Sequence, residues 1–185
     1  MHVIETYNLY IVLKNLVEFL YKRFQKRIAT GFSLKSFIEF YTTASGKLAD
    51  QTLSFNVRDN VWCFVYQRKF GITDARDLLK LLNEQKIEYA ILLYKENISS
   101  FAKKFISKLP VTVELFTHAD FICDPTNSIY ACKSSKKIKT NKKKVIKVLQ
   151  SDPIVKYYGW KQGDLIEYNR PLPNGNTFKI CRKVK

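Results

Sequence analysis

Residues 151–164 read SDPIVKYYGWKQGD, a stretch that holds both the start and the stop signals of a short helix. Asp152 can cap the helix with its carboxylate, and Pro153 stands at the first helical position, where no N–H partner is needed. Gly159 is placed to end the helix, and Gly163 followed by Asp164 has the composition of a turn. The stretch therefore predicts a capped helix that leads directly into a turn.

Two strand-like runs follow this helix, at Leu165–Tyr168 and Phe178–Val184. The residues between them, Pro171–Thr177, are rich in proline, asparagine and glycine, which is typical of a loop that joins two strands. We therefore expect a small C-terminal α/β domain that ends in a β-hairpin.

Further toward the N-terminus, short apolar strands alternate with amphipathic helices. The expected strands are Thr52–Val57, Val61–Tyr66, Tyr89–Tyr94 and Val111–Phe116. Val61–Tyr66 is almost continuously apolar, as in a strand that is covered on both faces. This order indicates a mixed sheet covered by helices, and together with the C-terminal domain it places the chain in the α+β class.

Three helices are expected in the first half of the chain. The first is Tyr7–Phe24, in which leucines recur at helical spacing. The second is Leu34–Tyr41, which Ser33 can cap. The third follows Thr73, which can cap it, and has Ala75, Leu78, Leu79 and Leu82 on one face. Asp74 in its first turn suits the helix dipole.

A fourth helix should begin at Ser99 or Ser100 and stop at Pro110. Helical spacing predicts that Phe101 and Phe105 point inward and that Lys103, Lys104 and Lys108 point outward.

The chain is strongly basic, with 32 Lys and Arg against 16 Asp and Glu among 185 residues, a formal net charge of +16. Such a chain is attracted to phosphate backbones or to an acidic protein surface. Its hydrophobic content of 46% is sufficient for a packed core. We expect no membrane span and no secretory signal, because the sequence has no long apolar segment and no signal-peptide pattern at its start.

Residues 133–147 contain eight lysines and no acidic residue. A solvated connector, a nucleic-acid contact and a nuclear-import signal are all compatible with this run.

The four cysteines do not form a C-x-x-C pair. Cys123, Cys132 and His118 are a weak candidate trio for zinc, and reduced thiols, at Cys63 and Cys181 as well, are the favoured interpretation. We expect neither a metal nor a cofactor.

The sequence shows no convincing active site. It has no phosphate-binding glycine loop and no G-x-S-x-G elbow. A metal-dependent nuclease needs clustered carboxylates, whereas the candidates Asp59, Glu88, Asp120 and Asp124 are spread along the chain. We therefore expect a protein that is not an enzyme, with a nuclease as a minor rival.

The run from Ser151 to Asp164, followed by Arg170-Pro171 and a final strand with Arg182, resembles the C-terminal domain of the fifth subunit of eukaryotic nuclear RNA polymerases, which has an archaeal counterpart. The family pattern is D-P-x-x-x-Y-x-G-x-K-x-G, a strand, R-P, a loop and a last strand. This chain keeps the spacing, with Phe178 at the start of the last strand, Cys181 in place of a frequent tyrosine, and a different loop.

The N-terminal part is similar to the jaw domain of the same family, more weakly. Ser99-Ser100-Phe101-Ala102-Lys103 resembles the T-P-S-A-K turn that lies beside downstream DNA in the family. The family has a long helix of acidic and basic residues between its two domains, whereas this chain has the shorter lysine run at 133–147. This difference and the high net charge suggest a divergent copy, which we take to be one encoded by a large DNA virus.

The resemblance implies a jaw domain at residues 1–119 and an assembly domain at 120–185, with a Lys-rich connector at about 133–147. It implies a non-catalytic polymerase subunit that anchors on the largest subunit, contacts other subunits and downstream duplex DNA, and acts at the site of transcription, in the nucleus, a viral cytoplasmic factory or a virion. The implied subunit-binding residues are Asp152, Pro153, Tyr157, Gly159, Gly163, Arg170, Phe178 and Arg182. The implied DNA-proximal residues are Ser99, Ser100, Ala102 and Lys103. The alternative is a free-standing basic nucleic-acid-binding protein.

Overall fold

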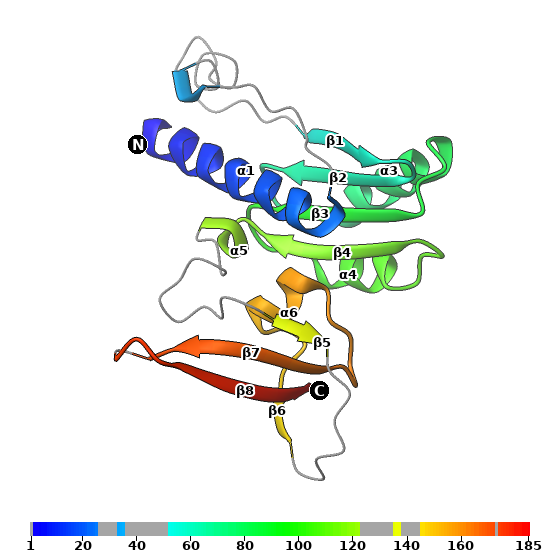
Figure 1. The fold of residues 1–185 in the computed structure, drawn as a ribbon. Coiled ribbons are helices and arrows are strands. Elements are labelled where there is room, and N and C mark those ends of the chain that lie inside the picture. The colour runs from blue at the N-terminus through cyan, green and yellow to red at the C-terminus, as the bar shows by residue number, and fades with distance from the viewer. Residues whose placement is uncertain (1, 26–32, 36–51, 123–134, 138–144, 173) are drawn as a thin grey trace. The chain divides into compact units, whose positions relative to one another are not determined.

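A computed structural model describes residues 2–25, 33–35, 52–122, 135–137, 145–172 and 174–185 (Figure 1). The chain divides into two compact units, Met1–Ile122 and Cys123–Lys185. Each unit combines helical structure with a mixed sheet, which confirms the α+β class.

The sheet of the first unit has the order β1-β2-β3-β4. β1 pairs antiparallel with β2, whereas β2, β3 and β4 run parallel. The strands are β1 (Leu53–Arg58), β2 (Val61–Tyr66), β3 (Tyr89–Tyr94) and β4 (Thr112–Thr117). β2 and β3 have the predicted bounds, and β1 and β4 are each shifted by one residue.

One face of this sheet is covered by α1 (His2–Phe24), which begins earlier than the predicted Tyr7. The strand register places Val65, Leu93 and Phe116 side by side on that face. Phe19 of α1 is fully buried, and its ring makes an edge contact with Phe116 at a centroid distance of 5.5 Å. The apolar stripe of α1 therefore packs on the inner residues of the parallel strands.

The opposite face is covered by α3 (Ile72–Glu84) and α4 (Ser100–Ile106) (Figure 1). Phe64 and Leu92 point to this side and form one buried cluster with residues of both helices. The helical members of the cluster are Ala75, Leu78, Leu82, Ala102 and Ile106. Because β2 and β3 are buried on both faces, their almost continuous apolar sequence is explained.

The prediction that Thr73 caps α3 is wrong. The cap position is Gly71, so Thr73 lies within the first turn. Glycine has no side chain for capping, and the Asp74 carboxylate instead accepts the Gly71 N–H at 2.7 Å and the Arg68 guanidinium at 2.6 Å. Asp74 therefore fixes the start of the helix, a stronger role than the predicted dipole effect.

Ser99 caps α4, as one of the two predicted starts, because its Oγ accepts the N–H of Ala102 at 3.2 Å. The prediction that Phe101 points inward is wrong, since Phe101 is 78% exposed. Ala102 and Ile106 supply the buried face instead, and Phe105 packs at its margin. Ala102 and Ile106 are four positions apart and therefore lie on one side of this seven-residue helix, the side that is buried.

Pro110 does not end α4, contrary to the prediction. The helix ends at Ile106. The chain then makes two tight turns, in which the Lys108 N–H donates to the Phe105 carbonyl and the Leu109 N–H donates to the Ile106 carbonyl. The exposed sites predicted for Lys103, Lys104 and Lys108 are confirmed. The predicted helix Leu34–Tyr41 lies almost wholly outside the described residues.

The described part of the second unit contains a sheet of order β5-β7-β8-β6 and one helix. β7 pairs antiparallel with both β5 and β8, and β6 pairs parallel with β8. The elements are β5 (Ser135–Lys137), β6 (Ile146–Val148), α6 (Pro153–Tyr158), β7 (Leu165–Pro171) and β8 (Thr177–Val184). β7 and β8 extend through Pro171 and Thr177, so the connection between them is shorter than the sequence predicts.

A small core holds the second unit together. Val155 and Trp160 from the α6 region pack with Ile166 of β7 and Val184 of β8, all at most 7% exposed. Val148 of β6 completes the cluster. Two segments of the lysine run at 133–147 thus belong to the sheet, as β5 and the start of β6.

In the parts of the chain that the structure describes, no helix is both long enough and apolar enough to cross a lipid bilayer.

Replacing Leu92 by alanine should lower the free energy of unfolding by about 2–5 kcal/mol, because its fully buried side chain packs in the central strand β3. Urea unfolding followed by circular dichroism measures this change. Leu81→Ala is the matched control, since Leu81 on α3 is 40% exposed. Equal losses in the two variants would contradict the assignment of β3 to the core.

Candidate functional site

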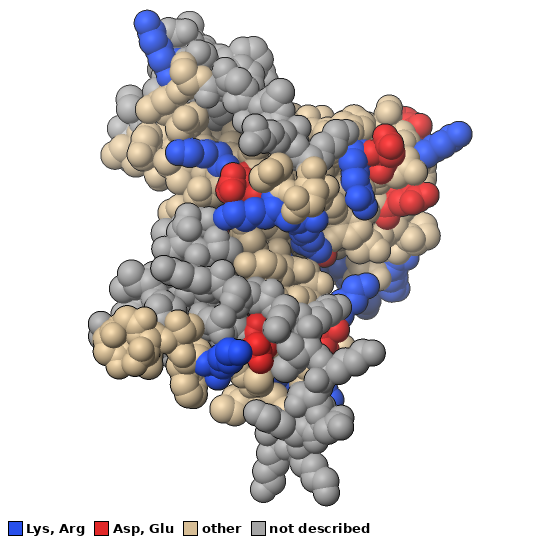
Figure 2. Space-filling model, in the orientation of Figure 1, with Lys and Arg blue, Asp and Glu red and all other residues tan. Residues whose placement is uncertain are grey.

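Charge on the described surface of the first unit is mixed in sign. Figure 2 shows basic and acidic side chains interspersed over the visible face of this unit. Several of the acids are paired, as in Glu18 with Lys22 and Glu5 with Lys95. Although the whole chain has a net charge of +16, the described residues of the first unit form no continuous basic surface on the side seen in Figure 2.

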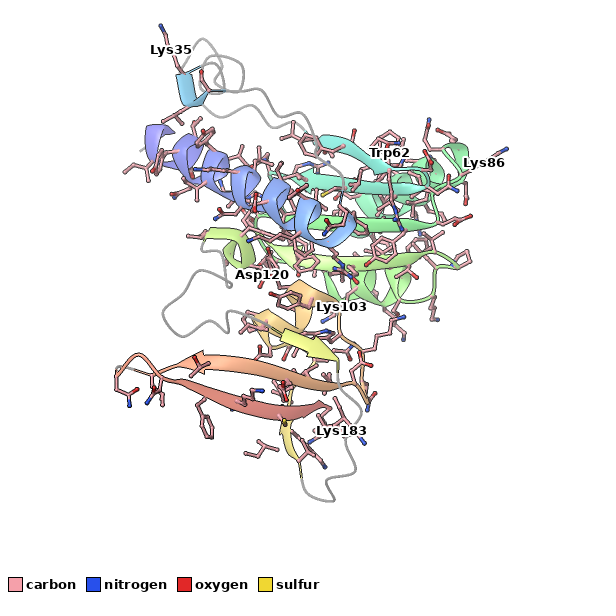
Figure 3. All side chains as sticks on the ribbon, viewed as in Figure 1. Lys35, Trp62, Lys86, Lys103, Asp120 and Lys183 are labelled. Atoms are coloured by element: carbon pink, nitrogen blue, oxygen red, sulfur yellow. The ribbon has the colours of Figure 1, made fainter. Side chains whose placement is uncertain are left out.

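The turn at residues 99–103 forms the start of α4 and exposes only part of its predicted DNA-proximal set. Ser100 and Lys103 are exposed, Ser99 is half-buried, and Ala102 is fully buried. Figure 3 labels Lys103 on α4 and Asp120 on α5 (Ala119–Ile122), two separate elements. An external ligand at this turn would meet Ser100, Lys103 and the exposed ring of Phe101, because Ala102 faces the core.

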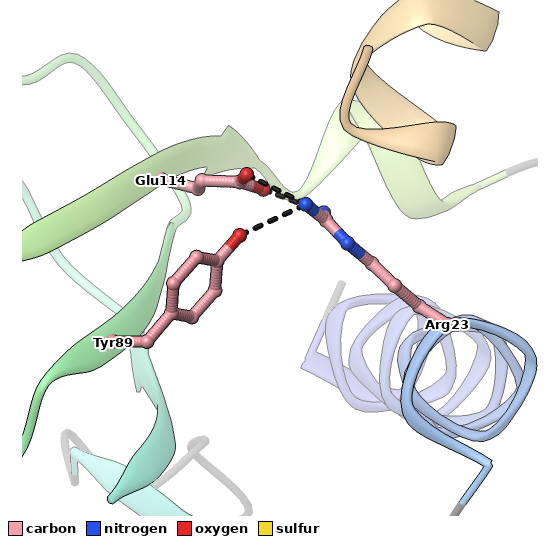
Figure 4. A network of polar contacts seen from close by, with 3 residues as sticks. All are labelled: Arg23, Tyr89 and Glu114. Atoms are coloured by element: carbon pink, nitrogen blue, oxygen red, sulfur yellow. Dashed lines mark hydrogen bonds and ion pairs between the residues drawn. The ribbon is translucent and has the colours of Figure 1, made fainter. Parts of the chain in front are cut away.

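A network that sequence reasoning missed ties α1 to the sheet (Figure 4). The guanidinium of Arg23 donates to both carboxylate oxygens of Glu114, at 2.6 and 2.7 Å, and to the hydroxyl oxygen of Tyr89 at 2.8 Å. Burial lowers the pKa of Arg23, but the bonds to Glu114 outweigh it, so this pKa lies above its ordinary value. Glu114 is a lone acid within an apolar strand, which was the available signal for a buried partner.

This network is structural in its chemistry. Arginine keeps its proton, and burial together with the bond to Glu114 raises the pKa of Tyr89. Neither group can therefore exchange a proton near neutral pH. The bidentate pair fixes the end of α1 on β4 and fits a positioning role.

A cavity of about 280 Å³ lies where β2, β3 and β4 end. Gln67, Lys95 and His118 follow these three strands directly, and residues of α1 complete the lining. Within the described structure, His118 Nε2 and both polar side-chain atoms of Gln67 are buried without a hydrogen-bond partner. Carboxyl ends of parallel strands are a usual place for ligands, but these atoms are covered by protein.

His118 is neutral at pH 7. Burial lowers its pKa, the positive charge of Lys95 lowers it further, and a hydrogen bond to the main chain of Tyr66 acts in the opposite direction, which leaves a pKa of about 4. The described residues that line this cavity include no serine, threonine or cysteine that the imidazole could activate as a nucleophile.

In the second unit, the residues named by the resemblance shape the local structure. The Asp152 carboxylate accepts the N–H of Ile154 at 3.0 Å, and Pro153 occupies the first turn of α6. Gly159 ends the helix in the left-handed conformation at φ 65°, and Gly163 has φ 92°. Their positions as caps and turns are confirmed, and they account for the regular spacing of the motif.

The remaining residues of that set lie on α6 and on the paired strands. Tyr157 is buried, whereas Phe178 at the start of β8 is 58% exposed. Arg182 is half-buried and lies opposite Ile166 in the β7–β8 register. Arg170 lies opposite Phe178, and its side chain is outside the described residues. Among the described side chains of the set, Phe178 is the aromatic one that is exposed to a partner.

The carboxylates considered for a nuclease are not brought together. Asp59 and Glu88 line one pocket with Arg58, but Asp120 caps α5 by accepting the N–H of Thr117 at 2.8 Å. Asp124 lies outside the described residues. In the described ranges, no group of three or more Asp, Glu, His or Cys side chains could hold a metal ion.

The weak zinc trio is only partly visible, because Cys123 and Cys132 lie outside the described residues. Cys63 and Cys181 are free thiols. Burial raises the pKa of the Cys63 thiol, so it remains protonated and unreactive.

Comparison with known proteins gives a family match for the second unit. Residues 131–184 match the RNA polymerase Rpb5 C-terminal domain family. The matched segment contains all the described helices and strands of the second unit, from β5 to β8. The resemblance seen in the motif from Asp152 onward is thus supported by the whole domain.

A relative extends the similarity beyond this domain. The chain is 23% identical over 131 residues to DNA-directed RNA polymerases I, II and III subunit rpabc1 of Dictyostelium discoideum, a match that covers 61% of this chain and 66% of the relative. The two findings support an Rpb5-type polymerase subunit, a type that is not itself catalytic.

Lowering the pH should destabilise the first unit through His118. Its pKa is about 4 when folded and about 6.5 when unfolded, so between these values only the unfolded chain takes up the proton. Stability should therefore fall as the pH is lowered from about 6.5 to about 4. Urea unfolding at a series of pH values measures the slope, and His118→Gln should reduce it; the same slope in both proteins would contradict the buried neutral state.

Proposed function

We propose that this protein is a non-catalytic structural subunit of a multisubunit DNA-dependent RNA polymerase, anchored on the largest subunit through its second unit. The observation that carries the proposal is the Rpb5 family match over residues 131–184, which coincides with a folded unit. Polymerisation chemistry belongs to other subunits in this account. The second unit is the assembly domain and the first unit is the jaw domain.

The anchor is supported by how the second unit presents its surface. Its core is small, yet large apolar side chains remain outside it. Phe178, Leu172 and Tyr158 are each at least 36% exposed. Tyr158 stacks on Trp160 with ring centroids 4.8 Å apart. Exposed, ordered aromatic side chains are typical of protein–protein contact sites.

The contact with downstream duplex DNA rests on charge and on the turn before α4. Lys103, Lys104 and Lys108 are exposed on or just after a helix whose buried residues hold it in place. Lysines contribute to DNA affinity through phosphates and carry no sequence information. In this account they help to hold entering DNA in any sequence.

The second candidate is a free-standing basic nucleic-acid-binding protein, which the net charge of +16 favours. Such a protein would bind nucleic acid in isolation and would form no stable complex with large subunits. Both candidates act where nucleic acid is transcribed or stored, and we place the polymerase subunit at sites of transcription, in the nucleus or in a viral factory.

Phe178→Asp should abolish co-purification with the largest subunit when the two are expressed together. A charge in place of the exposed ring would remove apolar contact and bury an unpaired carboxylate. Phe101→Asp is the matched control, because Phe101 is also highly exposed but lies in the first unit. Retained assembly in a pull-down with Phe178→Asp, and also after deletion of residues 151–185, would rule out this anchor.

Duplex DNA binding by the purified chain should weaken steeply with salt, with a slope of about −0.9 in log–log form for each phosphate contacted. Lys103→Gln should reduce the slope by about one unit if Lys103 makes such a contact. Lys80→Gln serves as a control, because Lys80 lies on α3 and pairs with Asp77. Fluorescence anisotropy at several salt concentrations measures both, and salt-independent binding would refute the electrostatic account.

A further inference from the structure

A basic pocket lies at the β6 edge of the second unit's sheet. Its volume is about 430 Å³, and the side chains around it include Lys147, Lys183 and Lys185. Gln162 and Gly163, from the turn after α6, complete it on one side. Gly163 is the one subunit-binding residue implied by the resemblance that is among the described residues lining this pocket. The pocket is therefore a feature separate from that set.

The three lysines are brought together by strand pairing. In the parallel register of β6 and β8, Lys147 lies beside Lys183, and Val148 lies beside Val184. The pairing continues, because the Lys185 N–H donates to the Val148 carbonyl at 2.8 Å. Side chains alternate along a strand, so the lysines share one face while Val148 and Val184 enter the core on the other.

This arrangement places the positive charges of three lysines around one pocket. No acidic side chain is among the described residues that line the pocket. The Asp164 carboxylate, in the adjacent turn, accepts the main-chain N–H of Lys161 at 2.7 Å. Like charges in neighbouring strand positions are unfavourable, and an anionic ligand would relieve this repulsion.

The surroundings favour a peptide over a phosphate backbone. Ile146, the first residue of β6, and Leu149, which follows the strand directly, are 68% and 60% exposed. β6 is the last strand in the sheet order, so its outer edge is open to a further strand within the described sheet. Phosphates need cations alone, whereas exposed aliphatic side chains beside a strand edge suit an extended segment with apolar residues.

We propose that the pocket of Lys147, Lys183 and Lys185 binds an extended acidic segment of a partner protein, with an aliphatic residue of that segment on Leu149. The inference deepens the proposed anchoring role by naming the chemistry of one docking segment. It adds a contact separate from the exposed ring of Phe178. The paired strands fix the backbone positions of the lysines before the partner arrives, which lowers the entropic cost of binding.

The test uses the full chain and a fluorescein-labelled peptide of alternating Glu and Leu residues, with binding followed by anisotropy. Lys183→Glu should weaken binding by about tenfold or more, because it places a like charge against the peptide. Lys179→Glu is the matched control, an exposed lysine of the same strand outside the pocket, and should have little effect. Leu149→Ser should also weaken peptide binding.

Three results would overturn the proposal. They are equal losses in Lys183→Glu and Lys179→Glu, equal affinity for a peptide with Gln in place of Glu, and binding of duplex DNA that depends on Lys183 while Leu149→Ser changes nothing. The last result would make the pocket a phosphate site. Peptide binding does not require a polymerase, so normal peptide binding by a chain that fails to co-purify with the largest subunit would contradict the anchoring role and leave this proposal standing.

Discussion

The first unit depends on the need to cover both faces of its parallel strands. β2 and β3 expose almost no polar side chains, so neither face can remain in water. α3 and α4 cover one face, and α1, although distant in sequence from β4, covers the other. The bidentate bond from Arg23 to Glu114 fixes the end of α1 on that strand.

The second unit is organised differently, with small numbers of residues in defined local roles. Asp152, Pro153, Gly159 and Gly163 set the ends of α6 and the turn after it, and a few apolar side chains join α6 to β6, β7 and β8. So little of its surface can be buried internally that aromatic and aliphatic side chains remain outside. In the proposed account a partner subunit covers these side chains, and the basic pocket at β6 binds an acidic segment of a partner.

Strand positions and the α6 caps could be predicted from sequence because they follow from local signals, namely continuous apolar runs and residues with special backbone preferences. The orientation of Phe101, the cap of α3 and the end of α4 could not be predicted in this way. Tertiary packing buries Ala102 and Ile106 and leaves Phe101 exposed, and the start of α3 is fixed by Asp74 in place of Thr73. The Arg23–Glu114 pair and the lysine pocket depend on contacts between distant segments. The sequence motif was sufficient to identify the second unit. It could not separate the predicted binding residues that shape the fold from those, such as Phe178, that are exposed, because burial depends on the tertiary structure.

The central claim, membership in a multisubunit polymerase, is tested most directly by purifying the tagged full-length chain from the cell that naturally expresses it and weighing the native complex by mass spectrometry. The account predicts a stable complex in which the chain and the largest polymerase subunit are present in equal numbers, and which synthesises RNA on a DNA template. Recovery of the chain alone, or only with nucleic acid that salt removes, would contradict the claim and favour a free-standing nucleic-acid-binding protein.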